Sequence, residues 1–583
     1  MTRRNATWRC AAVLGAAALA LLSPSVQPAA EAAHGPPLTT RAGVVAADDP
    51  TAAEVGARIL GRGGNAVDAA AATAFTLGVV NPTSSGIGGG GFALVYVAAE
   101  RKVHVYDFRE IAPAALDPGD FVVDGKLDPS LSRTGGLAVG VPGEVAGVYA
   151  MQRAYGALSW RRVVQPAARL ARDGFAVSYF LGRAAARVAG GLPAGVAYDP
   201  LRALLAPGGT PVEQGDRVDR EALAATLQAI AAGGADAFYR GPIAADLVAT
   251  TTAAGGVLTT DDLAGYQVTE REPLWGAWHG LRIATMPLPS SGGTVLLEAL
   301  GILDALARRG LDLAAMGAGS SAALHLTAEA LEHGFADRAR ALGDEAAAAA
   351  LAASMLDPAS LDAIAARIDP DHVGAHDAYG HPELAAPGAV RPDGGTSHLC
   401  VIDGDGNAVS MTTTVNGYFG SKLVSSTGVV LNNQIDDFAL QAGVANGFGL
   451  VQSELNLVAP GKKPLSSMTP TLLFDGDRVV GCVGGSGGPQ IISNVAQVIL
   501  NVFVYGMDAR AAVDSPRVHH QWLPDTLFVE PDIPADVRAG LERRGRVLGD
   551  ISQPTAVQLI VVRPDGRREA AGDGRKGGAA ATP

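Results

Sequence analysis

Cysteine is scarce in this 583-residue chain, which has only three, and its eleven histidines are scattered. Neither residue type shows the short repeated spacings of zinc ligands, so the sequence predicts no metal site. If Cys10 leaves with an N-terminal leader, only Cys400 and Cys482 remain in the mature chain. We expect each to be an inert buried thiol, with a disulfide between them as the alternative interpretation.

Long runs of like charge are also missing, although the formal net charge is −13. Without a basic stripe or a polybasic segment, the sequence predicts neither nucleic-acid binding nor a charged membrane patch. The 74 glycines and 35 prolines indicate many loops, and the 48% of hydrophobic residues indicates a chain that is mostly globular. Length alone suggests roughly two to four domains.

The first 33 residues have the features of an export signal. "MTRRNATWRC" supplies positive charge, "AAVLGAAALALL" a short apolar run and "QPAAEAA" small residues for cleavage. The apolar run is shorter than the roughly 20 residues of a membrane-spanning helix. We therefore predict a signal peptide over 1–33 and a periplasmic or secreted protein, with an uncleaved anchor as the alternative.

Turn residues divide the rest into helical and strand-rich blocks. Residues 50–82 read as two helices broken at Gly63 and Gly64, with Asn65 placed to cap the second. A glycine loop then leads into two strands, helical patterns dominate residues 143–375, and an irregular connector follows up to residue 395. Strands dominate again over 397–483. The mixture predicts layered helices and sheets and does not indicate tandem βαβ units.

Two glycine-rich stretches compete as functional motifs. "GIGGGG" at 86–91 matches the dinucleotide fingerprint by letters, but the strand pattern after it stands where that fingerprint needs a helix. "GGSGG" at 484–488 follows a strand and would make Ser486 a serine-hydrolase nucleophile, with His519 or His520 as its base. Alternatively, backbone N–H groups of this turn could hold a developing oxyanion and need no serine.

A third stretch, "DGGTSHLCVIDGDGNAVSMTTT" at 393–414, reads as a hairpin that begins oddly with two glycines and a threonine. A threonine hydroxyl is a weak nucleophile unless a base lies beside it. If the chain is cut before Thr396, the new α-amine can act as that base; its ordinary pKa near ~8 suits neutral pH. Glycines at 394 and 395 would permit the strained backbone that self-cleavage needs. A plain strand-leading threonine is the alternative.

Many stretches together resemble the γ-glutamyltranspeptidase family. They include "GGNAVDAAAATAFTLGVVNPTSSGIGGGGFALVYV", "VYDFREIAPA", "AEALEHGFADRARALGD", "DGGTSHLCVIDGDGNAVSMTTT", "VLNNQIDDF", "KKPLSSMTPTL" and "GGSGGPQII". They occur in family order from about residue 40 to near the C-terminus. Such a series is far more specific than any single glycine motif.

The resemblance implies an α+β N-terminal-nucleophile hydrolase with a four-layer αββα sandwich, made as one precursor that cuts itself between Gly395 and Thr396. Residues 34–395 would form the large subunit of a heterodimer and residues 396–583 the small catalytic subunit. Thr396 would be the nucleophile and Thr414 its hydrogen-bonding activator. Gly487 and Gly488 would form the oxyanion hole, which leaves Ser486 as turn filler.

The resemblance also supplies the substrate-binding residues. Arg109, Ser466 and Ser467 would bind the α-carboxylate of a γ-glutamyl group, and Asn416, Gln434 and Asp437 would accept hydrogen bonds from its α-ammonium. Two departures from the family pattern are Ser397, where threonine is common, and Phe448, where some relatives carry a lid tyrosine.

The expected activity is cleavage of glutathione and related γ-glutamyl compounds through a threonine ester, which passes to water, an amino acid or a peptide. No cofactor is expected. A glutaryl-cephalosporin-type acylase is the alternative within the fold, but an acidic Asp437 without a cation would be costly to bury. A nonprocessing relative that only binds its ligand is the alternative from another class; the intact Thr396 and Thr414 argue against it.

Overall fold

The computed structural model describes residues 35–380 and 395–583. The predicted signal peptide therefore lies outside the described residues, as does most of the predicted connector. Near the N-terminus the helices begin and end where the sequence indicates. Helix α1 (Pro50–Leu60) ends before the glycine pair, and α2 (Ala66–Val80) begins after Asn65, whose side chain accepts hydrogen bonds from Val67 and Asp68.

Two seven-stranded sheets form the centre of the molecule, and all neighbouring strands in them are antiparallel. The first sheet has the order β21 (Ala579–Ala581), β2 (Val44–Ala47), β12 (Ser397–Ile402), β13 (Ala408–Thr414), β3 (Gly90–Val97), β4 (Lys102–Phe108) and β9 (Thr269–Arg271). The second has the order β1 (Leu38–Thr40), β20 (Arg568–Ala571), β19 (Ala556–Val562), β15 (Arg478–Ser486), β14 (Thr471–Asp475), β11 (Leu281–Thr285) and β10 (Leu274–Trp278).

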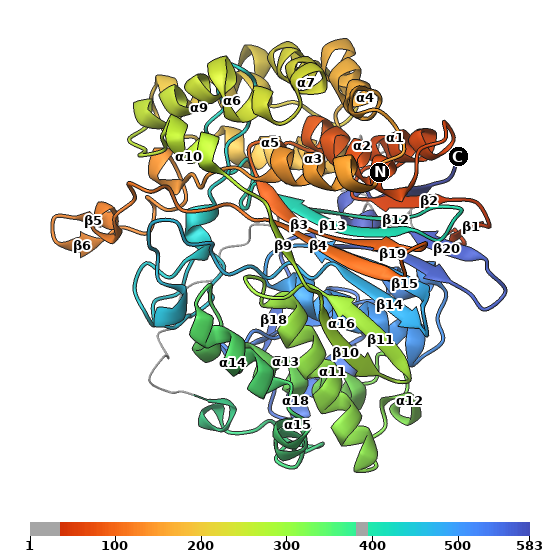
Figure 1. Cartoon of the computed structure of the whole chain (residues 1–583). Coiled ribbons are helices and arrows are strands. Elements are labelled where there is room, and N and C mark those ends of the chain that lie inside the picture. Colours follow the sequence, from red (N-terminus) through yellow and green to blue (C-terminus); the bar gives the residue numbers. More distant parts are fainter. Residues whose placement is uncertain (1–34, 381–394) are drawn as a thin grey trace, which may run out of the picture.

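Helices cover the outer face of each sheet, so the layers follow the order αββα (Figure 1). The layer on the first sheet contains α1, α2, α3 (Glu144–Tyr155), α4 (Trp160–Asp173), α5 (Tyr179–Ala189), α6 (Asp199–Leu205), α7 (Glu221–Gly233), α8 (Asp236–Tyr239), α9 (Gly241–Ala253) and α10 (Thr260–Gly265). The layer on the second contains α11 (Gly292–Arg308), α12 (Leu313–Met316), α13 (Ser321–Ala341), α14 (Ala346–Met355), α15 (Pro358–Ala365), α16 (Gln490–Phe503), α17 (Ala509–Asp514) and α18 (Ala535–Arg543). The predicted four-layer fold is confirmed.

Short strands complete the described structure. A three-stranded sheet contains β16 (Val518–His519), β17 (Leu527–Val529) and β18 (Leu548–Asp550), and two small hairpins pair β5 (Val122–Val123) with β6 (Lys126–Leu127) and β7 (Phe175–Ala176) with β8 (Arg217–Val218). Among the described residues no single helix is long and apolar enough to cross a membrane; α14 and α15 pass the same test only as a bent pair, by length and composition.

Both central sheets mix strands from the two predicted subunits. In the first sheet β2, β3, β4 and β9 precede residue 396, whereas β12, β13 and β21 follow it. In the second sheet β1, β10 and β11 precede it, and β14, β15, β19 and β20 follow it. Strands β9 to β11 lie inside the stretch where helical patterns had been expected to dominate.

A disulfide joins Cys400 of β12 to Cys482 of β15. The expectation of two inert thiols was therefore wrong. Alternation along both strands turns these side chains into the apolar layer between the sheets, where their Cα atoms are 5.9 Å apart. The bridge spans 82 residues of the predicted small subunit and ties its two sheets together.

Candidate active site

Thr396 and Thr414 meet at the end of the β12–β13 hairpin. Their hydroxyl oxygens lie 2.9 Å apart, and both side chains are buried. The backbone N–H of Asn416 donates to Thr414 Oγ1 at 2.8 Å, which leaves the Thr414 hydroxyl hydrogen able to point at Thr396. No other hydrogen bond to Thr396 Oγ1 occurs among the described residues. A base for this hydroxyl would therefore have to come from the α-amine that cleavage creates.

The backbone around Thr396 is unusual. Its φ of +139° lies in a region that side chains rarely adopt. Gly395 packs so tightly that a Cβ there would come within 2.2 Å of the Asn416 carbonyl oxygen. A glycine before the threonine is thus a steric requirement of this turn.

Gly487 and Gly488 directly follow β15; Gly488 lines the pocket that holds the two threonines, whereas Gly487 is not among its lining residues. Their φ values of +129° and +61° favour glycine. A Cβ would come within 2.5 Å of Thr555 at the first and 2.8 Å of the Phe448 ring at the second. Gly488, Phe448 and both threonines line one pocket, so backbone N–H groups at this turn are available near the nucleophile.

Ser486, the last residue of β15, is fully buried and lies in the sheet, so its description as turn filler was wrong. Its hydroxyl donates to Asp48 Oδ2 at 3.0 Å and accepts from Lys576 Nζ at 3.1 Å. His519 contacts Ser493 and Gln521 instead, and His520 lies near Glu332. With antiparallel sheets as well, the geometry argues against a serine hydrolase.

Opposite charges form a direct ion pair in the same pocket. Arg109 is buried; its Nη2 donates to Asp437 Oδ2 and its Nε to the Pro464 carbonyl. Gln434 Nε2 also donates to Asp437, at 2.7 Å, while Gln434 Oε1 is buried without a hydrogen-bond partner. Burial raises the pKa of Glu110, beside Arg109, to about 8, despite the opposing effect of that cation. This buried acceptor fits a ligand that donates a hydrogen bond, such as an ammonium.

Ser466, Ser467 and Asn416 complete the predicted set, and all three line this pocket. Ser466 Oγ accepts from the backbone N–H of Met468 at 3.0 Å. Asn416, with a φ of +74°, anchors its Nδ2 to the Asn433 carbonyl at 3.0 Å. The fold thus brings together residues predicted from well-separated parts of the sequence.

Comparison with known proteins identifies this constellation. A family model described as gamma-glutamyltranspeptidase matches residues 52–582. The chain belongs to the γ-glutamyltranspeptidase family. It is accordingly an enzyme, and the predicted resemblance is confirmed.

Two relatives from other organisms match this chain over nearly its whole length. It is 38% identical over 572 residues to the glutathione hydrolase proenzyme of Escherichia coli, covering 95% of this chain and 96% of that one. Identity to glutathione hydrolase 2 of Arabidopsis thaliana is also 38%, over 92% of this chain and 93% of that protein.

Solved structures share the N-terminal-nucleophile hydrolase fold. The structure of a cephalosporin acylase from Bacillus halodurans superposes with a TM-score of 0.82 at 27% identity, over 97% of this chain and 99% of that one. A γ-glutamyltranspeptidase from Helicobacter pylori superposes with a TM-score of 0.52 at 34% identity, over 58% of this chain and 93% of that one. The higher sequence identities thus belong to glutathione hydrolases and γ-glutamyltranspeptidases.

Two buried cations near the nucleophile had not been predicted. Lys576 Nζ donates to the Thr396 carbonyl oxygen at 2.8 Å and lies 3.6 Å from Asp48. Arg338, on α13, lines the pocket and donates from Nε to Ser291 Oγ at 2.9 Å. Arg338 lies in "AEALEHGFADRARALGD", one of the stretches that resemble the family, so the sequence could have indicated it as a candidate site residue. Lys576 lies in no such stretch.

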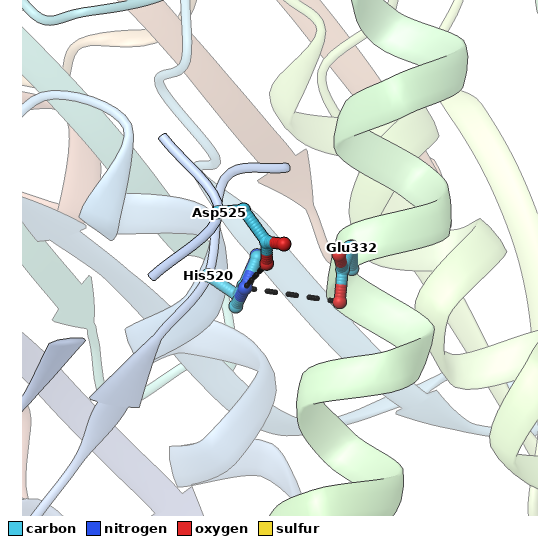
Figure 2. A group of neighbouring side chains, drawn as sticks. All are labelled: Glu332, His520 and Asp525. Atoms are coloured by element: carbon cyan, nitrogen blue, oxygen red, sulfur yellow. Dashed lines mark ion pairs between the residues drawn. The ribbon is translucent and has the colours of Figure 1, made fainter. Parts of the chain in front are cut away.

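A second cluster of titratable side chains joins α13 to the segment after β16 (Figure 2). His520 Nε2 lies 3.7 Å from Glu332 and 3.6 Å from Asp525. Three such groups could ligate a metal ion, but Arg546 already donates to Glu332 at 2.6 Å. This arrangement is that of an ion-pair network. The expectation of no metal site stays a prediction.

Proposed function

We propose that this protein is an exported, self-processing γ-glutamyl hydrolase and transferase that acts on glutathione and related γ-glutamyl compounds. The central support is the 2.9 Å contact between the Thr396 and Thr414 hydroxyls, in a pocket that also holds the Arg109–Asp437 pair. The names of the relatives, glutathione hydrolase, agree with this activity.

In the proposed reaction, the α-amine of Thr396 takes the hydroxyl proton while Oγ1 attacks the γ-carbonyl carbon of the substrate. The Thr414 hydroxyl donates to Oγ1, and the N–H groups of Gly487 and Gly488 stabilise the oxyanion. The C–N bond then breaks as the α-ammonium of Thr396 gives this proton to the leaving amine, and a γ-glutamyl ester remains on Thr396. Water or the amine of an amino acid or peptide attacks this ester and regenerates the hydroxyl.

The same hydroxyl is proposed to cut the precursor after Gly395. That cut would give a large chain of residues 34–395 and a small chain of residues 396–583 that remain together as a heterodimer. Strain at Thr396, with φ +139°, and the close packing of Gly395 support this site. The E. coli relative is named a proenzyme, which agrees with processing.

Recognition of the γ-glutamyl group is assigned to the two sides of the pocket. Arg109, Ser466 and Ser467 would bind the α-carboxylate, since a guanidinium and two hydroxyls are suitable donors. Asp437, Gln434 and Asn416 would bind the ammonium, and the unpartnered Gln434 Oε1 supports this assignment. A glutaryl substrate would leave these acceptors unfilled, so the acylase alternative is disfavoured.

Export is supported by the N-terminal sequence and by the Cys400–Cys482 disulfide. Disulfides persist mainly in oxidising compartments such as the periplasm and the extracellular space. The disulfide therefore agrees with export of the protein by a signal peptide over residues 1–33.

Intact-mass spectrometry of the purified protein tests the proposal. We expect two chains, the smaller beginning at Thr396, and turnover of γ-glutamyl-p-nitroanilide. Thr396→Ala should remain one uncleaved, inactive chain, whereas Ser486→Ala should still be cleaved. An active wild-type protein that is intact at the Gly395–Thr396 bond would refute the mechanism.

A further inference from the structure

Arg338 lies inside the candidate active site without the partner that a buried cation needs. Its side chain extends from α13 into the pocket that Thr396, Arg109 and Asp437 also line. Only 2% of the residue is exposed. One hydrogen bond, from Nε to Ser291 Oγ, fixes the guanidinium, and Ser291 in turn donates to the Ser466 carbonyl at 2.6 Å.

The charge of Arg338 is not balanced by an ion pair in the described part of the chain. Arg109, Arg517 and Arg546 are similarly buried, and each contacts a carboxylate. For Arg338, by contrast, no carboxylate lies within 4.0 Å among residues 35–380 and 395–583, and its Nη1 is buried without a hydrogen-bond acceptor. Leaving a charged donor in this state is costly, so the position suits an anionic ligand.

One pocket therefore contains a hydrogen-bond acceptor and a hydrogen-bond donor that both lack a partner among the described residues. Gln434 Oε1 is a buried acceptor without a donor, and Arg338 Nη1 is a buried donor without an acceptor. A ligand with an ammonium and a carboxylate on one carbon would satisfy both. The hydrogen bonds from Arg338 to Ser291 and from Ser291 to the Ser466 backbone carbonyl link Arg338 to the segment whose serines the proposed function assigns to the carboxylate.

We infer that Arg338 is a second cation for the α-carboxylate of the γ-glutamyl donor, acting beside Arg109. A carboxylate has about four acceptor positions, enough for two guanidinium groups and two hydroxyls. Asp437 neutralises the charge of Arg109, so Arg338 supplies the additional positive charge for the substrate carboxylate. This inference rests on the proposed function and adds a specificity residue to it.

The test compares substrates with and without the carboxylate. γ-Glutamyl-p-nitroanilide carries only the α-carboxylate, and 4-aminobutanoyl-p-nitroanilide is the same compound without it. Arg338→Met should lower kcat/KM for the first by roughly 30-fold or more, the usual result of removing one partner of a desolvated charge pair. The loss for the second should stay below about threefold, and Arg338→Lys should restore part of the activity toward the first.

Arg340→Met is the matched control, because Arg340 lies on the same helix, pairs with Asp337 at 3.1 Å and does not line the pocket. Equal losses on both compounds, or no loss on either, would overturn the inference. A loss seen only with glutathione would also overturn it, since Arg338 would then contact the leaving group. Failure of the wild-type enzyme on both compounds would instead refute the proposed function, and subunit masses report whether each variant folds and processes.

Discussion

Replacing Asp437 by asparagine separates recognition of the ammonium from recognition of the carboxylate. The change keeps the size of the side chain but removes the anion that Arg109 and Gln434 contact. In the empty enzyme, Glu110 can take over as counter-ion, because its Oε2 lies 3.8 Å from Arg109 Nη1. The negative charge of Asp437 contributes to the raised pKa of Glu110, about 8, so its removal lowers that pKa and favours ionised Glu110. We therefore expect Asp437→Asn to fold and process.

The loss on a γ-glutamyl substrate follows from the contacts. Removing one partner of a buried charge pair costs about 2–5 kcal/mol. The Asp437 side chain is 12% exposed, and Gln434 Oε1 remains as an acceptor, so we expect the lower part of this range. A loss of about 2–3 kcal/mol corresponds to roughly 30- to 160-fold in kcat/KM. A glutaryl substrate has no ammonium and so loses no contact when Asp437 is replaced; its kcat/KM should therefore stay unchanged or rise.

The assay measures kcat/KM for γ-glutamyl- and glutaryl-p-nitroanilide with wild type, Asp437→Asn and Asp436→Asn. Asp436 is a matched control, because it is buried next in sequence but contacts Ser132 and Arg133 and does not line the pocket. Any effect of Asp436→Asn should be the same on both substrates. Equal losses on the two substrates for Asp437→Asn would refute the reasoning and give Asp437 a role in the fold or in support of the nucleophile.

Ser486→Ala should cost less than about tenfold in kcat and keep covalent acyl labelling, because the hydroxyl only bridges buried groups; loss of labelling with cleavage intact would restore the serine-hydrolase hypothesis. Above pH 8, ionisation of Glu110 adds a negative charge beside the proposed carboxylate site, so KM for γ-glutamyl substrates should rise, and Glu110→Gln should remove that rise; an identical rise in the variant would contradict this assignment. Replacing Cys400 and Cys482 together by alanine removes a link across 82 residues, worth up to about 4 kcal/mol, and should lower the Tm measured by scanning calorimetry; an unchanged Tm would show that the bridge adds no stability.

Local patterns predicted the parts of the fold in which sequence neighbours interact. Asn65 caps α2 as expected, because capping involves residues only two or three positions apart. The β12–β13 hairpin was predicted for the same reason. Strands β9 and β11 were missed because their partners β4 and β14 lie far away in sequence. The β10–β11 hairpin is local, but its two short strands interrupt a mostly helical stretch and were missed as well.

The candidate site was predicted where the family resemblance carried it, and apart from Gly395 and Gly487 the predicted residues line one pocket. Sequence could not show that Arg109 and Asp437 contact each other, since they are 328 residues apart. It also favoured two free thiols over the disulfide, because the two cysteines face each other only once both sheets have stacked. The contact of Lys576 with the Thr396 carbonyl depends in the same way on tertiary packing.

The mixing of strands in the two central sheets means that the proposed cut would divide the chain without dividing the fold. Separating the two products would require breaking the pairings of β12 with β2, β13 with β3 and β14 with β11, which lie inside the sheets. Neither product contains a complete sheet, so each would expose unpaired strand edges and apolar faces if it were made alone. The order of events would then be constrained: the chain would have to fold before the proposed cut, and the single precursor would be the template that assembles both subunits.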